Sequence, residues 1–206
     1  SHKVQLEIPG LRIKKELTTD AKGYASFEIK AKPILWSTEN PYLYQVSLST
    51  DTDKVTDEIG FRTIETKGRQ ILLNGNPVFL KGISIHEEAP FRSGRICSEE
   101  EDLTLLNWAK ELGCNYVRLA HYPHNEKMVR LAEKMGLMVW SEIPVYWTIQ
   151  WENKDTYQNA HNQLMEMIER DQNRAAVIIW SIANETPHGE ARDRFLSNLA
   201  KAAREK

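Results

Sequence analysis

The sequence predicts a chain of mixed β and α/β class: a partial immunoglobulin-like β-sandwich followed by the first half, four βα units, of a (β/α)8 TIM barrel. Two observations predict this architecture. Residues 1–66 hold short alternating segments separated by Gly, Pro and Asn, which is typical of antiparallel strands. Residues 67–206 instead alternate short apolar runs with amphipathic segments, which is typical of βα units around a parallel sheet. We therefore expect two domains, 1–66 and 67–206.

The first domain is expected to be antiparallel throughout. Alternating apolar and polar residues predict strands over residues 4–8, 24–29, 43–48 and 58–64. An immunoglobulin-like sandwich needs about seven strands in about 100 residues, and fewer are visible here. Either the first strands precede this sequence or the domain is unusually small, and we favour the first alternative.

The second domain is expected to begin with a hairpin turn at Asn74–Gly75 and then to repeat a strand and a helix. Strands are predicted over residues 78–85, 115–120, 137–140 and 177–182, and helices over 98–112, 125–135, 155–170 and 190–204. A closed barrel needs about 250 residues, so these units make half of one. A self-contained open sheet is the alternative. A nucleotide-binding fold has no support, because no Gly-rich phosphate loop follows the first strand.

Composition narrows the classes of partner. The chain is 41% hydrophobic and 27% charged with a formal net charge of −2, which is an ordinary soluble composition without an electrostatic case for nucleic acid. No apolar run approaches the roughly 20 residues of a membrane span. Cys97 and Cys114 form neither a disulfide framework nor a metal-ligand spacing. We expect no nucleic acid, no membrane span and no cofactor; the cellular location is not readable, and a secreted or periplasmic parent protein stays open.

Polar residues follow each predicted strand of the second domain. In chain order they are His86, Glu87, Glu88, Arg118, His121, His124, Glu142, Asn184 and Glu185. In a parallel barrel the carboxyl ends of all strands lie on one face, so we expect these side chains to line one pocket.

Several of these candidates have a plain structural explanation. His86 could cap a helix or lie on the surface. Arg118 lies within an apolar strand, where a guanidinium needs a carboxylate partner, so a buried ion pair and a role in the site are both open. The histidines lack the spacing of metal ligands. Trp147 and Trp151 fall in a loop, where each could stack on a sugar or pack beneath the loop.

Glu185 is the most suggestive residue, because it follows Asn184 at the end of the apolar run 177–182. Without a Gly-x-Ser-x-Gly motif or a Cys beside a base, acyl transfer has no support. Cleavage of a glycosidic bond needs two carboxyl groups, one of which protonates the leaving oxygen. We expect Trp180 and its apolar neighbours to exclude water from Glu185 and favour the protonated acid; a solvated loop carboxylate is the alternative. Asn184 could bind the sugar 2-hydroxyl.

Three stretches of the sequence resemble signatures of glycoside hydrolase family 2, the group of β-galactosidases, β-glucuronidases and β-mannosidases. They are residues 115–123 with 136–140, residues 173–185, and residues 60–62 with 74–82 and His86–Glu87. The resemblance covers nearly the whole chain and looks nearest to the β-galactosidases. It implies an internal segment of a retaining β-glycosidase that acts on a carbohydrate.

By position in these motifs, the resemblance implies that Glu185 is the general acid and then the general base. It also implies that Asn184, His121, Arg118 and His86 line the sugar subsite. The nucleophile of the family is a second Glu on a later strand, so it would lie beyond this sequence. We therefore expect the segment alone to be inactive and to act with the remainder of a larger enzyme; an oligomer stays open.

Other readings stay open within this resemblance. The parent could be a β-glucuronidase or β-mannosidase of the same family, or the segment could be a non-catalytic carbohydrate-binding or scaffold module. Some β-galactosidases hold a metal with a Glu and a His after the third strand. Here Tyr146 and Thr148 stand at those positions, so we expect no metal.

Overall fold

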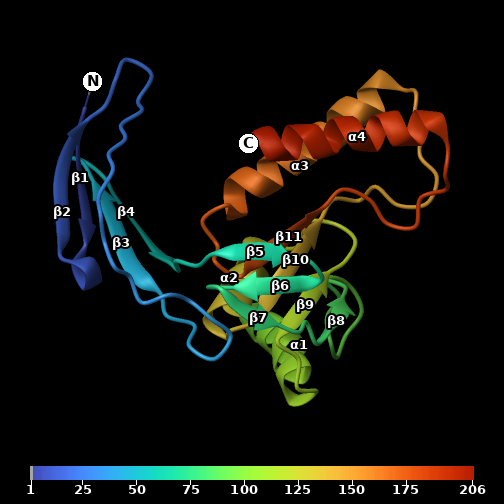
Figure 1. Cartoon of the computed structure of the whole chain (residues 1–206), viewed down its shortest axis with the longest axis horizontal. Helices are drawn as coiled ribbons and strands as arrows, with labels where there is room; N and C mark the ends of the chain where they lie inside the picture. Colours follow the sequence, from blue (N-terminus) through green and yellow to red (C-terminus); the bar gives the residue numbers. More distant parts are fainter. Residues whose placement is uncertain (1) are drawn as a thin grey trace.

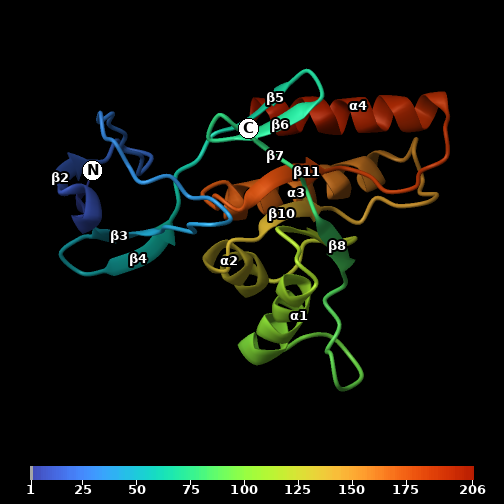
Figure 2. The same ribbon diagram turned by 60° about the horizontal axis from the view of Figure 1, so that its bottom comes forward.

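The computed structural model describes residues 2–206, which form three β-sheets and four α-helices (Figure 1). An antiparallel sheet lies at one end of the molecule and the helices lie at the other. A third, small sheet connects them along the chain and is seen separately in Figure 2. The predicted mixture of β and α/β structure is therefore confirmed. None of the helices in residues 2–206 is long and apolar enough to cross a bilayer.

The first sheet has the order β2-β1-β3-β4, with every neighbouring pair antiparallel. Its strands are β1 (Lys3–Ile8), β2 (Ile13–Thr18), β3 (Tyr44–Ser49) and β4 (Lys54–Ile59). Ile8, Ile13 and Tyr44 are the buried residues on one of its faces, and Phe27 packs against them. The alternation that predicts β1 and β3 arises because only this face is withdrawn from water.

Three features of this domain differ from the prediction. Residues 24–29 form no strand; Ala25, Phe27 and Ile29 instead line the apolar groove over the sheet, so the segment covers a face rather than pairing along an edge. The apolar pattern does not predict β2, because Lys14–Glu16 are charged, and an edge strand tolerates such residues. The predicted strand 58–64 is two strands, since β4 ends at Ile59 and β5 begins at Ile64.

The small sheet comprises β5 (Ile64–Lys67), β6 (Gln70–Leu73) and β7 (Asn76–Val78), all antiparallel. Its second turn contains Asn74 and Gly75 with φ of 54° and 78°. These left-handed values match a two-residue hairpin turn that Asn-Gly favours, so the predicted hairpin is confirmed. The predicted strand 78–85 is shorter in the structure, because β7 ends at Val78 and β8 begins only at Gly82.

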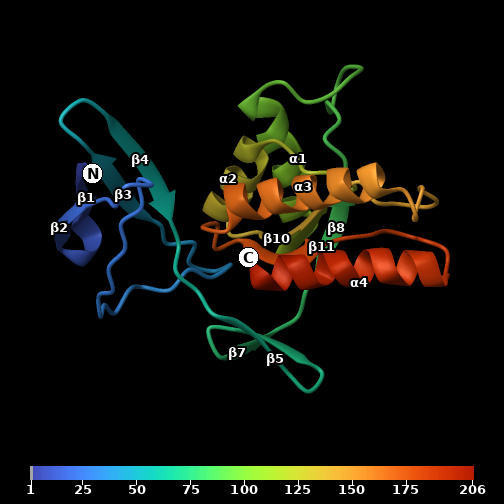
Figure 3. The ribbon, with the colours of Figure 1, turned by 90° about the horizontal axis from the view of Figure 1, so that it is seen from above.

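The third sheet is parallel, in the order β11-β10-β9-β8. Each of its strands is followed by a helix: β8 (Gly82–Ile85), α1 (Glu99–Glu111), β9 (Tyr116–Leu119), α2 (Glu126–Lys134), β10 (Met138–Glu142), α3 (Lys154–Asp171), β11 (Val177–Ser181) and α4 (Glu190–Glu205). Neighbouring helices pack against one another in chain order (Figure 3). The core between sheet and helices includes Val117, Met128, Val139 and Leu164, none of them more than 1% exposed. All carboxyl ends of the strands therefore lie at one edge.

Side chains at the helix starts explain where the helices begin. Ser98 accepts a hydrogen bond from the backbone N–H of Glu101 at the start of α1. Asn125 does the same for Met128 in α2, and Asn153 for Asp155 and Thr156 in α3. Each cap satisfies donors that the first helical turn leaves free. The capping pattern at Ser98 predicts the start of α1 correctly.

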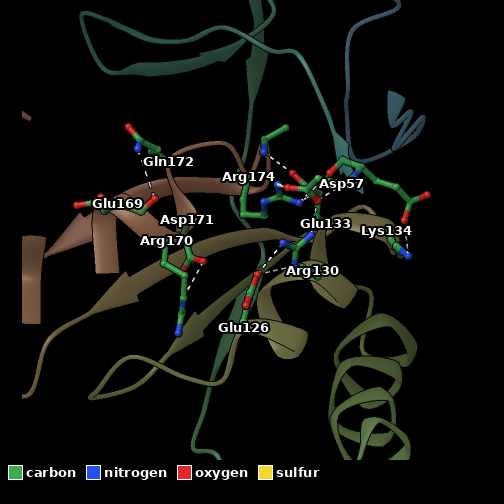
Figure 4. A network of polar contacts seen from close by, with 12 residues as sticks. Asp57, Glu126, Arg130, Glu133, Lys134, Glu169, Arg170, Asp171, Gln172 and Arg174 are labelled. Carbon is green, nitrogen blue, oxygen red and sulfur yellow. Dashed lines mark hydrogen bonds and ion pairs between the residues drawn. The ribbon is translucent and has the colours of Figure 1, made fainter. Parts of the chain in front are cut away.

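A network of ion pairs joins the first sheet to the parallel sheet (Figure 4). Asp57 on β4 accepts from Arg130 on α2 and, at 2.5 Å, from Arg174, which precedes β11. Arg174 also lies 3.3 Å from Glu133, whose carboxylate accepts the backbone N–H of Ala175. Burial raises the pKa of Glu133 to about 7, although Arg174 favours its charged form. The network thus holds β4 against the amino-terminal end of β11.

Arg62 makes a second connection to the same end of β11. Its Nε donates to the carbonyl of Ala175 at 3.0 Å and its Nη2 to the carbonyl of Val177 at 2.5 Å. The indole of Trp36, which is 0% exposed, donates to the carbonyl of Glu133 at 3.0 Å. Side chains from the first 62 residues therefore satisfy carbonyls at the amino-terminal end of β11 and at the end of α2.

Candidate active site

The predicted site residues lie at the carboxyl ends of the parallel strands. His86 follows β8, Arg118 is in β9, His121 follows β9, and Asn184 and Glu185 follow β11. The structure brings Arg118 into direct contact with Asn184 and with a fourth residue, Glu142 at the end of β10, and Glu142 in turn contacts His121. This edge is the place where a parallel barrel holds its chemistry.

Glu142 is the centre of the cluster. Its carboxylate is 1% exposed and accepts from the guanidinium of Arg118 at both oxygens: Oε2 accepts from Nε at 3.1 Å, and Oε1 accepts from Nη2 at 3.0 Å. It also accepts from the ring of His121. Such a bidentate pair offsets the cost of burying both charges. Because its oxygens are occupied by these donors, Glu142 is a poor candidate for a nucleophile.

Arg118 also determines the orientation of Asn184. Its Nη2 donates to Asn184 Oδ1 at 2.7 Å, and its guanidinium carbon lies 4.7 Å from the ring centre of Trp140. The carboxamide oxygen is therefore engaged with an arginine that has no acceptor atoms. The amide Nδ2 of Asn184 is the end left to donate to another molecule.

The contact between His121 and Glu142 assigns the ring proton. A carboxylate only accepts, so Nδ1 of His121 carries the hydrogen that it donates to Glu142. The 3.2 Å approach of Arg118 Nη2 to the same Nδ1 is then a contact between two donors. Nε2 is the ring atom that remains free. The exposed ring of His86 lies edge-on beside His121, with ring centres 5.3 Å apart.

Glu185 lies beside this cluster and is held by Trp147. The indole Nε1 of Trp147 donates to Glu185 Oε2 at 3.0 Å, and its backbone N–H donates to the carbonyl of Asn184 at 3.1 Å. Glu185 is exposed, so the expected exclusion of water by Trp180 is wrong for this chain. The reason is local: β11 ends at Ser181, and Glu185 turns away from it with a left-handed φ of 49°.

Other polar residues at this edge serve the fold. Glu87, 3% exposed, accepts from Arg95 and from Asn125 Nδ2 at 2.8 Å, and so ties the loop after β8 to the start of α2. Glu88 forms an isolated β-bridge with Arg95. His124, 2% exposed, donates from Nε2 to the carbonyl of Ala120 at 2.9 Å. Burial lowers the pKa of His124 to about 4, so this ring stays neutral.

The two loop tryptophans differ: one packs beneath the loop and the other is exposed. Trp151 packs edge to face against Phe195 with ring centres 5.4 Å apart, so it lies beneath the loop. Trp147 is 63% exposed and contacts Glu185 instead. Within residues 2–206, no group of three or more His, Cys, Asp or Glu side chains is arranged to hold a metal ion. Tyr146 lies near His121 with ring centres 6.0 Å apart.

Glu142 is the residue whose importance the sequence pattern does not reveal. A signal for it exists, since an arginine inside an apolar strand requires a carboxylate, and Glu142 ends the next apolar strand. The pattern gives no means to select it from the other acids at the strand ends. The role of Trp147 depends on the path of a loop and has no comparable signal.

Two family models match the chain. The model of the "Glycosyl hydrolases family 2, TIM barrel domain" matches residues 64–205, and the model of "Glycosyl hydrolases family 2" matches residues 3–62. The parallel sheet followed by helices, with polar side chains at the carboxyl ends of its strands, agrees with the TIM barrel domain that the first model describes. The chain belongs to glycoside hydrolase family 2.

Individual relatives agree with this membership. A β-glucuronidase from Streptococcus agalactiae is 35% identical over 178 residues, which cover 76% of this chain and 29% of that protein. A β-galactosidase from Alteromonas mediterranea is 32% identical over 182 residues, which cover 82% of this chain and 17% of the relative. The chain therefore spans less than a third of the length of these curated relatives.

Solved structures give the same result for the fold. A β-glucuronidase from Bifidobacterium dentium, solved with coumarin-3-O-glucuronide, matches with a TM-score of 0.89 at 26% identity. The match covers 98% of this chain and 35% of that one.

Proposed function

We propose that this chain forms part of a retaining β-glycosidase, with Glu185 as the general acid and then the general base. The observation that carries the proposal is the cluster of Arg118, His121, Glu142 and Asn184 beside Glu185 at the carboxyl ends of β9, β10 and β11. It combines an accessible carboxylic acid with fixed hydrogen-bonding groups, which is the equipment that glycoside cleavage needs.

The proposed reaction has two steps. Glu185 donates its proton to the glycosidic oxygen while a second carboxylate attacks the anomeric carbon, so the leaving group departs as an alcohol and a glycosyl–enzyme ester forms. Glu185, now ionised, takes a proton from water, and the oxygen of that water displaces the ester. The second carboxylate must lie about 5 to 5.5 Å from the acid.

We propose roles for the neighbouring residues in the same reaction. The free Nδ2 of Asn184 donates to the sugar 2-hydroxyl, a contact that strengthens in the transition state. Nε2 of His121 and the exposed ring of His86 face the same sugar, and Arg118 keeps Asn184 in its donating orientation. Neither a metal nor a cofactor is part of this proposal.

The proposed nucleophile belongs to a larger protein of which this chain is a part. Residues 1–66 would complete an immunoglobulin-like sandwich there, and residues 67–206 would be the first half of its barrel. The short coverage of the relatives supports this view. On this proposal the isolated 206-residue chain hydrolyses no glycoside.

The sugar at the cleavage site is a β-galactoside or a β-glucuronide. Relatives with either name match at similar identity, so the preference for a β-galactosidase is not supported over its alternative. The test is hydrolysis of 4-nitrophenyl β-galactoside and β-glucuronide by the full-length protein and by the 206-residue chain. The proposal predicts turnover of one substrate by the full-length protein and none by the chain. Turnover by the chain that is lost in Glu185→Gln would contradict the missing nucleophile.

A further inference from the structure

Trp147 is the one large aromatic residue that is both exposed and bonded to Glu185 within the described chain. Its side chain is 63% exposed, and its Nε1 donates to Glu185 Oε2 at 3.0 Å. The other loop tryptophan, Trp151, packs against Phe195. Since exposed indole surface is unfavourable in water, the position of Trp147 beside the acid requires an explanation.

Several contacts hold the indole in this place. The backbone N–H of Trp147 donates to the carbonyl of Asn184, and the backbone N–H of Asn184 donates to the carbonyl of Val145 at 2.8 Å. Tyr146 lies edge-on to the indole with ring centres 5.8 Å apart. Trp147 and Glu185 both have left-handed backbone angles, with φ of 54° and 49°. Such angles are unfavourable in a residue with a side chain, and persist where neighbouring contacts determine them.

The hydrogen bond has a consequence for the acid. The carbonyl oxygen of a protonated carboxyl group is a better acceptor than its hydroxyl oxygen, so the N–H of Trp147 favours Oε2 as the acceptor. This hydrogen bond thereby favours the acidic proton on Oε1. The indole therefore selects the oxygen that transfers the proton.

The contact with the acid is the reason to assign the indole to the leaving-group side. A general acid protonates the oxygen of the bond that breaks, so whatever lies beyond the acid faces the departing group and not the retained sugar. The sugar side is occupied by the cluster of Arg118, His121 and Asn184. An indole face favours a flat or ring-shaped partner with an apolar surface.

We propose that Trp147 positions Glu185 and forms the platform of the leaving-group subsite, where it stacks on a ring-shaped aglycone, either an aryl group or a sugar ring. This inference rests on the proposed function of Glu185. It makes two separable claims, one about the N–H donor and one about the ring face.

Two variants of the full-length protein separate these claims. Trp147→Phe keeps an aromatic platform and removes the N–H donor. Trp147→Asn removes the ring and retains a residue that tolerates left-handed backbone. Trp151→Phe, which alters a packed ring, is the matched control. The measurements are kcat and KM for three aglycones on one sugar: methyl, phenyl and glucosyl.

The two variants have different expected signatures. Trp147→Phe should lower kcat for the methyl glycoside by about tenfold, since proton transfer matters most for a poor leaving group, and leave KM for the phenyl glycoside within about twofold. Trp147→Asn should in addition raise KM for phenyl and glucosyl aglycones by about tenfold, but not for methyl. A larger effect on the phenyl than on the glucosyl substrate would identify an aryl partner, and the reverse a sugar.

Equal changes for all three aglycones in both variants would overturn the inference, because a general loss of structure has no aglycone preference. Thermal melting of each variant shows whether the protein folds. If Trp147→Asn does not fold, Trp147→Phe still tests the N–H donor, and Trp147→Leu, which also removes the aromatic ring, tests the ring face. Glu185→Gln is assayed in parallel. If it hydrolyses the methyl glycoside normally, the proposed function itself fails; if only the aglycone preference is absent, the role of Trp147 alone fails.

Discussion

Arg118 and Glu142 form a bidentate ion pair across the neighbouring strands β9 and β10, in which Nε donates to Oε2 at 3.1 Å and Nη2 donates to Oε1 at 3.0 Å. The pair determines which atoms of the neighbouring side chains can donate hydrogen bonds. Through Arg118 it makes Asn184 a donor, and through Glu142 it keeps the proton of His121 on Nδ1. This buried ion pair thus orients the side chains of Asn184 and His121 as well as stabilising the fold.

Glu142→Gln should disturb the tautomer of His121. The amide keeps the size of the carboxylate but loses its charge and half of its acceptor capacity, so Nδ1–H of His121 is no longer favoured. We expect ¹⁵N NMR of the histidine rings to show Nδ1–H in the native chain and a mixture of tautomers in the variant. Glu152→Gln, at a residue whose side chain is 83% exposed, is the control. Identical ring shifts in Glu142→Gln and the native chain would contradict the assigned hydrogen bond.

Arg118→Lys should weaken the site although it preserves the charge. An ammonium group cannot donate in parallel to Glu142 and reach Asn184 Oδ1 at the same time. Loss of these bonds should lower the free energy of unfolding by about 1 to 3 kcal/mol, which urea denaturation measures. Arg194→Lys changes a side chain that is 64% exposed and should have no effect. Equal stability of both variants would show that the fork geometry of Arg118 is unimportant.

Arg62→Met should loosen the contact between the segment that follows β4 and the amino-terminal end of β11. The substitution leaves the carbonyls of Ala175 and Val177 without their donor. Hydrogen bonds to a charged group contribute about 1.5 to 3 kcal/mol each, so we expect the unfolding free energy to fall by about 3 kcal/mol. The exposed Arg69 provides the matched substitution Arg69→Met. A change of less than a few tenths of a kcal/mol in Arg62→Met would mean that water replaces the guanidinium without cost.

His124 should make the fold sensitive to acid. Burial, with a smaller contribution from the nearby His86, Arg95 and Arg170, lowers its pKa from 6.5 to about 4, although the hydrogen bond to the carbonyl of Ala120 opposes the shift. The unfolded chain therefore binds the proton more tightly, and stability is lost as the pH falls from 6.5 towards 4. A shift of this size corresponds to about 3 kcal/mol. Glu133 has the opposite effect on stability. Because its pKa is raised in the folded chain, its contribution to the stability of the fold is lost as the pH rises.

The variant His124→Gln isolates this contribution. We expect the difference in unfolding free energy between native chain and variant to shrink steadily between pH 6.5 and pH 4 by about 3 kcal/mol. His188→Gln, at an exposed residue, should run parallel to the native chain at every pH. Parallel curves for His124→Gln as well would show that His124 does not titrate in this range.

The apolar runs were sufficient to predict the parallel sheet. Residues 115–120, 137–140 and 177–182 are found as β9, β10 and β11, because a strand buried on both faces needs little besides apolar side chains. The same logic fails in the first domain. Lys14–Glu16 lie in β2, and residues 24–29 form no strand, because edge pairing and face covering depend on neighbours distant in sequence.

In the site, too, some features could be predicted from the local sequence and others depend on residues distant in the sequence. Arg118 could be predicted to need a carboxylate from its own surroundings, whereas the choice of Glu142 depends on the register that sets Arg118 beside Trp140 on the adjacent strand. The exposure of Glu185 depends on a left-handed turn that no residue type between Ala183 and Pro187 demands. Residue types therefore indicate the chemistry, and the pairing of strands decides which side chains meet.

The central claim is that Glu185 is the acid that protonates the leaving group. Its most direct test is Glu185→Gln in the full-length protein, assayed with a methyl and a 2,4-dinitrophenyl glycoside of the preferred sugar, with the exposed Glu190→Gln as control. We predict a fall of about 10² to 10⁴-fold in kcat/KM for the methyl glycoside and a much smaller fall for the dinitrophenyl glycoside, whose leaving group needs no proton. Unchanged hydrolysis of the methyl glycoside would contradict the claim.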